Sequence, residues 1–188
     1  DLDNRALGGV KIDVIMGRNA GFLTAAAALA RTESDDGPHL IYLPERAFSM
    51  DRFVKDVKAA MKLYGRCVVA VSEGITDRTG TPILAAYTQE TDSHGNVQLS
   101  GTGALGDLLA KVLKERAGIK RVRADTFGYL QRSFPGIASA TDAMEARLVG
   151  VAAVKAAVED EISSGSIAIK RRDTKAYNVD FAVVTLRS

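Results

Sequence analysis

Short apolar runs alternate with stretches of helical periodicity along most of the chain. The runs at 11–16, 40–43, 67–71 and 121–126 predict strands, because each is short and mostly apolar. Apolar residues at helical spacing predict helices over 21–31, from Ser49 to Gly65, from Leu105 to Gly118, and from Ser139 or Thr141 to about residue 162. This alternation predicts an α/β fold with a mostly parallel sheet.

The pattern changes in two places. Residues 76–103 are polar and rich in turn-forming residues, which predicts a surface loop or insertion. Near the end of the chain, 166–171 and 177–184 alternate between apolar and polar positions on either side of a short polar turn. Such alternation around a turn predicts a β-hairpin at the edge of the fold.

Composition narrows the class of protein. The 188 residues are 46% hydrophobic and 26% charged with a net charge of +2, which is typical of a soluble globular chain without a nucleic-acid or membrane surface. No apolar run approaches the ~20 residues that span a bilayer. The single cysteine, Cys67, lies in an apolar run, so we expect a buried thiol and a reducing, cytoplasmic location.

Candidate binding residues follow two of the predicted strands. Gly17 and Arg18 follow the first strand, where a glycine lets a ligand approach the backbone and a guanidinium can bind phosphate or hydroxyl oxygens. Glu73 follows the third strand, where a carboxylate can accept hydrogen bonds from sugar hydroxyls. The alternatives are a tight turn with a solvated arginine and an exposed turn glutamate. Open α/β sheets bind small ligands at such strand ends.

A third candidate segment surrounds the predicted strand at 121–126. Arg121, Arg123 and Arg132 lie close together in the sequence, and two converging guanidiniums can bind one phosphate. A salt-bridged edge strand would have the same composition, so the residues alone leave the two interpretations equal.

Two other patterns are weak evidence for a functional site. Residues 101–106 match G-x-G-x-x-G, with Asp125 at the spacing of a ribose-binding acid, which is the pattern of a dinucleotide site. The stretch before residue 101 is too polar for a buried parallel strand, so a glycine-rich helix entrance is favoured. His39 and His94 have no Cys or carboxylate at ligand spacing, so no metal site and no histidine-based catalytic site is predicted.

Three segments together resemble the phosphofructokinase family: Met16-Gly17-Arg18, Ser72-Glu73-Gly74 and Gly128-Tyr129-Leu130-Gln131-Arg132. The resemblance extends from about residue 11 to about residue 158 and is to the second half of such an enzyme. The Tyr-x-x-Arg form, followed by Ser-Phe-Pro, is similar to the pyrophosphate-dependent branch. ATP-dependent relatives more often carry His-x-x-Arg followed by Gly-Gly.

The resemblance implies a fold and a set of binding residues. It implies a three-layer α/β/α, Rossmann-like domain over 1–162 that binds a sugar phosphate, with a strand pair at 163–188 packing on it. The residues expected to contact fructose 6-phosphate are Met16, Gly17, Arg18, Glu73, Tyr129 and Arg132, with Arg123 reaching the 6-phosphate of a neighbouring subunit. Arg5 is the only candidate for a second cross-subunit arginine.

The implied reaction is the glycolytic transfer of a phosphoryl group to fructose 6-phosphate, with pyrophosphate as donor and Mg²⁺. The alternatives are an ATP-dependent enzyme and a non-catalytic sugar-phosphate-binding module. The family's donor loop and its Thr-Ile-Asp-Asn-Asp stretch do not occur in these 188 residues. We therefore expect no catalytic or metal-binding residue here, an inactive isolated chain, and a donor site in an N-terminal half absent from this chain. A homo-oligomer, dimer or tetramer, is also expected.

Overall fold

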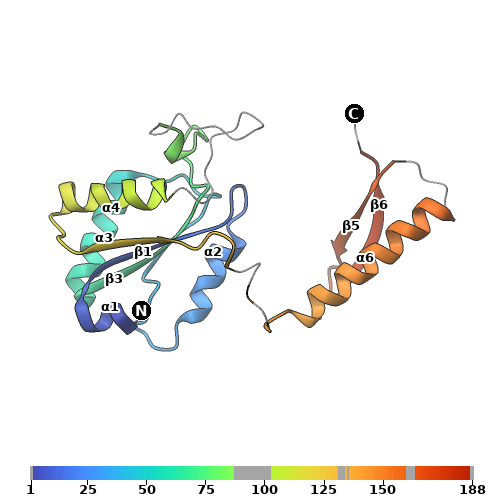
Figure 1. Cartoon of the computed structure of the whole chain (residues 1–188), viewed down its shortest axis with the longest axis horizontal. Helices are drawn as coiled ribbons and strands as arrows, with labels where there is room; N and C mark the ends of the chain where they lie inside the picture. Colours follow the sequence, from blue (N-terminus) through green and yellow to red (C-terminus); the bar gives the residue numbers. More distant parts are fainter. Residues whose placement is uncertain (1, 87–102, 131–133, 135, 160–163, 187–188) are drawn as a thin grey trace. The chain divides into compact units, whose positions relative to one another are not determined.

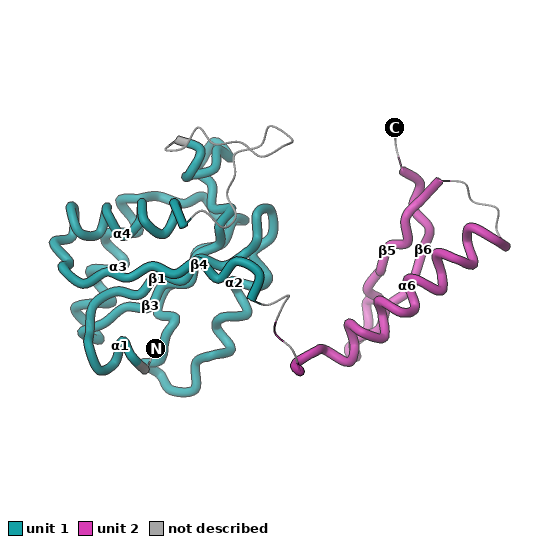
Figure 2. Tube along the Cα trace, viewed as in Figure 1, with its two compact units in different colours: residues 1–132 teal, residues 133–188 magenta. Residues whose placement is uncertain are grey.

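The computed structural model describes residues 2–86, 103–130, 134, 136–159 and 164–186. The chain forms two compact units, residues 1–132 and 133–188 (Figure 2). The predicted domain limits, 1–162 and 163–188, differ from these units and stay a prediction. None of the described helices is long and apolar enough to cross a membrane.

The first unit is built on a four-stranded parallel sheet. Its strands are β1 (Gly9–Ile15), β2 (Leu40–Tyr42), β3 (Arg66–Ser72) and β4 (Val122–Thr126). Their order is β2-β3-β1-β4, so β1 pairs in parallel with both β3 and β4 (Figure 1). The predicted parallel sheet is confirmed.

Helices lie on both faces of this sheet, as the predicted three-layer arrangement requires. One face is covered by α3 (Met50–Tyr64) and α4 (Ala104–Ala117). On the other face lie α2 (Phe22–Ala26) and the 3₁₀ turn η1 (Ala27–Ala30), while α1 (Leu2–Leu7) lies by the starts of β1 and β3 (Figure 1).

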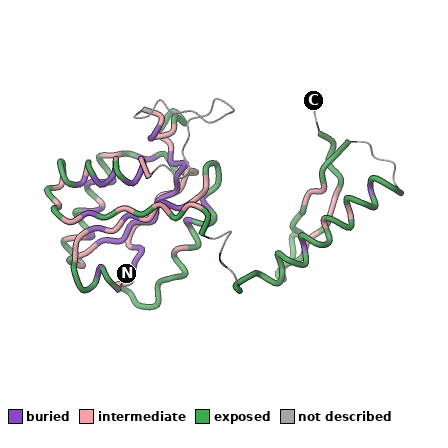
Figure 3. Tube along the Cα trace, viewed as in Figure 1, coloured by how far each residue is buried: buried purple, intermediate pink, exposed green. Residues whose placement is uncertain are grey.

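The hydrophobic core lies between the sheet and the α3–α4 layer (Figure 3). Its fully buried side chains come from alternate positions of β1 and β3 and from the inner faces of the helices: Val10, Ile12, Val69, Val71, Phe53, Val57, Leu109 and Leu113. Cys67 belongs to this core, and burial raises the pKa of its thiol to about 12, so the predicted buried cysteine is confirmed.

Capping residues set the helix ends where the sequence predicted them. The Ser49 hydroxyl accepts a hydrogen bond from the Arg52 N–H at 3.4 Å and begins α3. Gly65 ends this helix with φ of 71° and donates its N–H to the Met61 carbonyl. Gly118 ends α4 in the same left-handed conformation, with φ of 68°.

In the second unit, the described residues form one helix and one hairpin. The helix is α6 (Ala140–Val158), and the Ser139 hydroxyl accepts from the Asp142 N–H at 3.2 Å to cap it. The strands β5 (Ser166–Arg171) and β6 (Val179–Val184) pair antiparallel. The predicted C-terminal hairpin is confirmed, although its second strand starts two residues later than residue 177.

Three elements differ from the sequence prediction. The helix expected over 21–31 is α-helical only in α2 and continues as the 3₁₀ turn η1. The short helix α1 was not predicted. In the predicted loop 76–103, residues Ile83–Ala86 form the 3₁₀ turn η2 and Leu84 is buried in the core, while residues 87–102 lie outside the described part of the chain.

We expect acid to lower the free energy of unfolding of the first unit, because His39 takes up a proton when the unit unfolds. Its Nδ1 accepts a hydrogen bond from the Val68 N–H at 2.8 Å, so the imidazole is held neutral in the folded chain. Desolvation, followed by the charge of Arg66, lowers the pKa of His39 below its usual 6.5. The unfolded chain therefore binds a proton more readily. The free energy of unfolding should be unaffected by His39 above about pH 6.5 and should fall as pH drops below it.

Urea unfolding at several values between about pH 5 and 8 measures this effect. His39→Asn is the control, because its side-chain oxygen can replace Nδ1 as acceptor but cannot titrate. The variant should lose part of the decline in stability below pH 6.5. An unchanged decline would show that other groups cause it.

Candidate functional site

The three strands β1, β3 and β4 end side by side at one edge of the sheet. The register pairs Ile15 with Ser72 across β1 and β3, and Val14 with Thr126 across β1 and β4. Because the strands are parallel, the segments that begin at Met16, Glu73 and Phe127 leave the sheet next to one another. This edge is where open α/β sheets bind ligands.

Gly17 forms the turn after β1. Its φ is 151°, and a Cβ on this residue would lie 2.5 Å from the carbonyl oxygen of Ala20. Its N–H donates to Glu73 Oε1 at 3.4 Å, and its carbonyl accepts a hydrogen bond from the Ser72 hydroxyl. The turn therefore requires a glycine and is bound to the end of β3.

Glu73 is buried at this edge, with only 6% of its surface exposed. Its N–H donates to the Ile15 carbonyl at 3.0 Å, which extends the pairing of β3 with β1. Its carboxylate faces the Gly17 amide. The alternative of an exposed turn glutamate is therefore wrong.

Gly74 and Arg18 form the next contact between the two segments. A Cβ on Gly74 would lie 1.8 Å from the Arg18 carbonyl oxygen, so the Arg18 backbone packs directly on Gly74. The Arg18 side chain is exposed and Met16 is half-buried. The predicted residues of the first and third strands thus meet at one place.

The third segment comes from the end of β4. The Phe127 N–H donates to the Val14 carbonyl at 2.9 Å, and Gly128 then turns the chain with φ of 55°. Tyr129 follows with 58% of its surface exposed. The predicted Arg132 lies outside the described residues.

Arg123 is not brought to this edge within one chain. It lies near the start of β4 and pairs in register with Lys11, while the turn at Gly17 follows the other end of β1. The Lys11 amine makes an ion pair with Asp125 and lies 3.6 Å from Asp13. The predicted cross-subunit role of Arg123 stays a prediction.

Arg5, the second cross-subunit candidate, is part of α1 and makes an ion pair with Asp36. Hydrogen bonds from the Glu33 N–H and from Thr32 lower the pKa of Asp36, and the contact with Arg5 lowers it further. Within this chain the Arg5 guanidinium therefore binds a carboxylate that is fully ionised at neutral pH.

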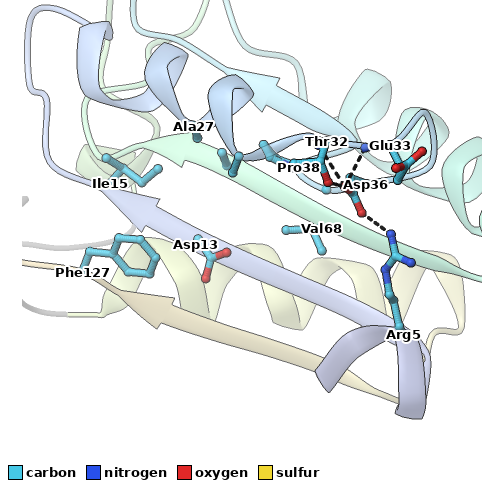
Figure 4. Close-up of a pocket in the computed structure, with 13 residues that line it drawn as sticks. Arg5, Asp13, Ile15, Ala27, Thr32, Glu33, Asp36, Pro38, Val68 and Phe127 are labelled. Atoms are coloured by element: carbon cyan, nitrogen blue, oxygen red, sulfur yellow. Dashed lines mark hydrogen bonds and ion pairs between the residues drawn. The ribbon is translucent and has the colours of Figure 1, made fainter. Parts of the chain in front are cut away.

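A cavity of about 610 Å³ lies on the sheet face that α3 and α4 do not cover (Figure 4). Its floor is mostly apolar and includes Ile15, Val68 and Phe127, and Arg5 lies at one end. Asp13 also lines it, and burial raises the pKa of Asp13 despite the nearby amine of Lys11. Gly17, Arg18, Glu73 and Tyr129 do not line this cavity, although Ile15 and Phe127, at the ends of β1 and β4, do.

Glu45 also lies just after a strand, β2, but its carboxylate contacts the start of a helix. Its Oε1 accepts the Gly21 N–H at 2.7 Å, at the start of α2. Gly21 lacks the side chain that would approach the Glu45 carboxylate to 2.9 Å. This contact gives Glu45 a structural role at the start of α2.

No metal centre can be built from the residues that the structure describes. They include no group of three or more His, Cys, Asp or Glu side chains that could hold a metal ion. We therefore assign no metal ligand among the described residues of the edge.

Comparison with known proteins identifies the family. The phosphofructokinase family model matches residues 5–157. The chain belongs to the phosphofructokinase family. Pyrophosphate–fructose 6-phosphate 1-phosphotransferase from Rhodospirillum rubrum is 57% identical over 188 residues, covering 99% of this chain and 46% of that protein. The protein of the same name from Xanthomonas campestris is 44% identical over 144 residues, covering 77% of this chain and 33% of its own length.

A solved structure gives the same result. The crystal structure of pyrophosphate-dependent phosphofructokinase from Marinobacter aquaeolei superposes with a TM-score of 0.70 at 29% sequence identity, covering 98% of this chain and 42% of that one. This phosphofructokinase chain spans about half the length, or less, of the relatives that it matches.

Gly74→Ala tests the close packing at the edge. The new Cβ would overlap the Arg18 carbonyl, so the turn must move, and such overpacking costs about 1–3 kcal/mol of the free energy of unfolding. Gly150→Ala is the matched control, because a Cβ there meets nothing within 4 Å and helical alanine is favoured over glycine. Urea unfolding should show a loss for the first variant and none for the second. Equal stability of both would contradict the packing.

Proposed function

We propose that this chain is the substrate-binding half of a pyrophosphate-dependent 6-phosphofructokinase, acting in glycolysis. The parent enzyme would transfer a phosphoryl group from pyrophosphate to O1 of fructose 6-phosphate and form fructose 1,6-bisphosphate. The observation that carries the proposal is the meeting of the Gly17–Arg18 turn with Glu73 and Gly74 at one sheet edge in a phosphofructokinase chain. Relatives named pyrophosphate–fructose 6-phosphate 1-phosphotransferase support the choice of donor.

The chemistry of the edge suits a phosphorylated sugar. A buried carboxylate such as Glu73 accepts hydrogen bonds from hydroxyl groups, and a guanidinium such as that of Arg18 binds phosphate oxygens. Tyr129 adds a phenol that can donate and accept. A ligand with hydroxyls at one end and an anionic group at the other can use all three groups.

Each predicted site residue then has a role in this proposal. Met16 and Gly17 would shape the pocket, and Glu73 and Tyr129 would contact the sugar. Arg18 and Arg132 would supply positive charge, and Arg123 would reach the 6-phosphate bound by a neighbouring subunit. This last role implies a homo-oligomer and agrees with the position of Arg123 away from the edge of its own chain.

The phosphoryl donor, Mg²⁺ and the base that removes the O1 proton would be held by residues outside this chain. Phosphoryl transfer needs all three beside the sugar, because the reaction depends on positioning and on neutralising the phosphate charge. We therefore expect the 188 residues alone to bind the sugar phosphate but not to turn it over. An ATP-dependent parent enzyme is the second candidate, since the edge residues contact the sugar and not the donor.

Glu73→Gln in the intact parent enzyme tests the sugar site. The amide can still accept the Gly17 N–H but loses the charge that strengthens hydrogen bonds from the sugar. A lost hydrogen bond to a charged group costs about 1.5–3 kcal/mol, so kcat/KM for fructose 6-phosphate should fall about 10- to 100-fold. Steady-state kinetics with the sugar varied at saturating donor measures it.

Glu45→Gln is the matched control for this substitution. Both glutamates lie just beyond a strand and accept a glycine N–H, but Glu45 holds the start of α2. Its variant should keep kcat/KM for the sugar close to that of the wild type. If both variants behave alike, Glu73 has no special role in sugar binding.

The intact parent enzyme should prefer pyrophosphate to ATP. This expectation depends on the Tyr129-Leu130-Gln131-Arg132 motif and on the names of the relatives at 57% and 44% identity. Parallel assays with the magnesium complexes of pyrophosphate and ATP, at fixed fructose 6-phosphate, give kcat/KM for each donor. A higher value with ATP would favour the second candidate.

A further inference from the structure

Ser72 is a buried polar residue that the proposed function does not use. It is the last residue of β3, it follows the apolar run from Cys67 to Val71, and none of its surface is exposed. A hydroxyl in such a place costs free energy unless it is hydrogen-bonded. Its partner is the Gly17 carbonyl, to which the Ser72 Oγ donates.

This hydrogen bond is one of two that hold the backbone of Gly17. The Gly17 N–H donates to the carboxylate of Glu73, and the Gly17 carbonyl accepts from Ser72. Ser72, the last residue of β3, and Glu73, which follows it, thus bind both backbone polar groups of Gly17. Because the carbonyl of Gly17 and the N–H of Arg18 belong to one planar peptide, Ser72 also sets the orientation at which Arg18 leaves the turn.

The backbone of Arg18 is held from the same side. Its carbonyl packs against Gly74, where any side chain would collide with it. Ser72, Glu73 and Gly74 therefore each contact the turn of Gly17 and Arg18, one through a hydroxyl, one through a carboxylate and one through the absence of a Cβ. Glu73 is a predicted sugar ligand, whereas Ser72 is fully buried and so cannot reach a ligand at the surface.

We propose that Ser72 is a positioning residue of the sugar-phosphate site, which orients the Gly17–Arg18 peptide and thereby Arg18 without touching the ligand. The inference depends on the proposed function for its kinetic consequence. Loss of the Ser72 hydroxyl leaves the Gly17 carbonyl without this donor and lets the peptide rotate. A displacement of the order of 1 Å at a binding group can cost about 100-fold.

The experiment compares Ser72→Ala with Ser49→Ala in the intact parent enzyme. Each substitution removes one hydrogen bond between a serine hydroxyl and the backbone, but Ser49 caps α3 and does not contact the turn. Ser72→Ala should raise KM for fructose 6-phosphate about 10- to 100-fold, with KM for the donor unchanged. Ser49→Ala should lower thermal stability and leave both KM values unchanged. Equal sugar KM values for the two variants would overturn the inference.

A cysteine substitution covers the case in which Ser72→Ala does not fold. Ser72→Cys fills a similar volume but is a weak donor, so it should show the same direction of change in KM for the sugar. A wild-type KM in this variant would overturn the role of the hydroxyl.

A second readout separates this inference from the proposed function. If the wild-type parent enzyme does not act on fructose 6-phosphate with either donor, the proposed function is wrong. The variants then have no sugar KM to compare. Amide hydrogen exchange still reports on the turn. Ser72→Ala should speed exchange at Gly17 and Arg18 relative to wild type, and Ser49→Ala should not. Unchanged exchange at both amides would overturn the positioning role.

Discussion

The parallel pairing of β1 with both of its neighbours is the constraint on which the site depends. The register aligns Ile15 with Ser72 and thereby brings the turn at Gly17 to Glu73. A shift of one residue would move every side chain of β1 to the opposite face. Val10 and Ile12 would then leave the core, so the hydrophobic packing also fixes the geometry of the edge.

The two faces of the sheet differ because β1 and β4 alternate in polarity. Parallel strands covered on both faces are usually continuously apolar. Here Lys11, Asp13, Arg123 and Asp125 share the face opposite α3 and α4, and the Lys11 amine makes an ion pair with Asp125. Exposed ion pairs contribute little to stability. The free energy of folding therefore comes mainly from the apolar core on the side of α3 and α4.

Sequence patterns predict those helices and strands whose ends are set by neighbouring residues. The predicted ends of the helix between Ser49 and Gly65 are confirmed, because a capping hydroxyl and a left-handed glycine mark them in the sequence. The helix α1 could not be predicted, because it has six residues and depends on Asn4, whose amide donates to the carbonyl of Cys67 at 3.4 Å. A contact between residues this far apart in the sequence leaves no local pattern.

The same distinction applies to the site. Strand ends can be predicted from sequence, and Gly17, Arg18 and Glu73 each follow a predicted strand of a parallel sheet. The hydrogen bond from Ser72 to Gly17 depends on the register between two strands that are far apart in the sequence, and serine at a strand end gives no signal of it. The position of Arg123 away from the edge likewise follows from the pairing of β4 with β1.

Glu73 shows how the scaffold and the binding surface are joined. Its carboxylate is buried and already faces the Gly17 amide, so little conformational entropy is lost when it accepts a ligand hydroxyl. Ser72 ends a buried strand and Glu73 follows it directly, so under the proposed function the core strand β3, and not a surface loop, would position the sugar contact. Tyr129 differs from both residues, because it is exposed.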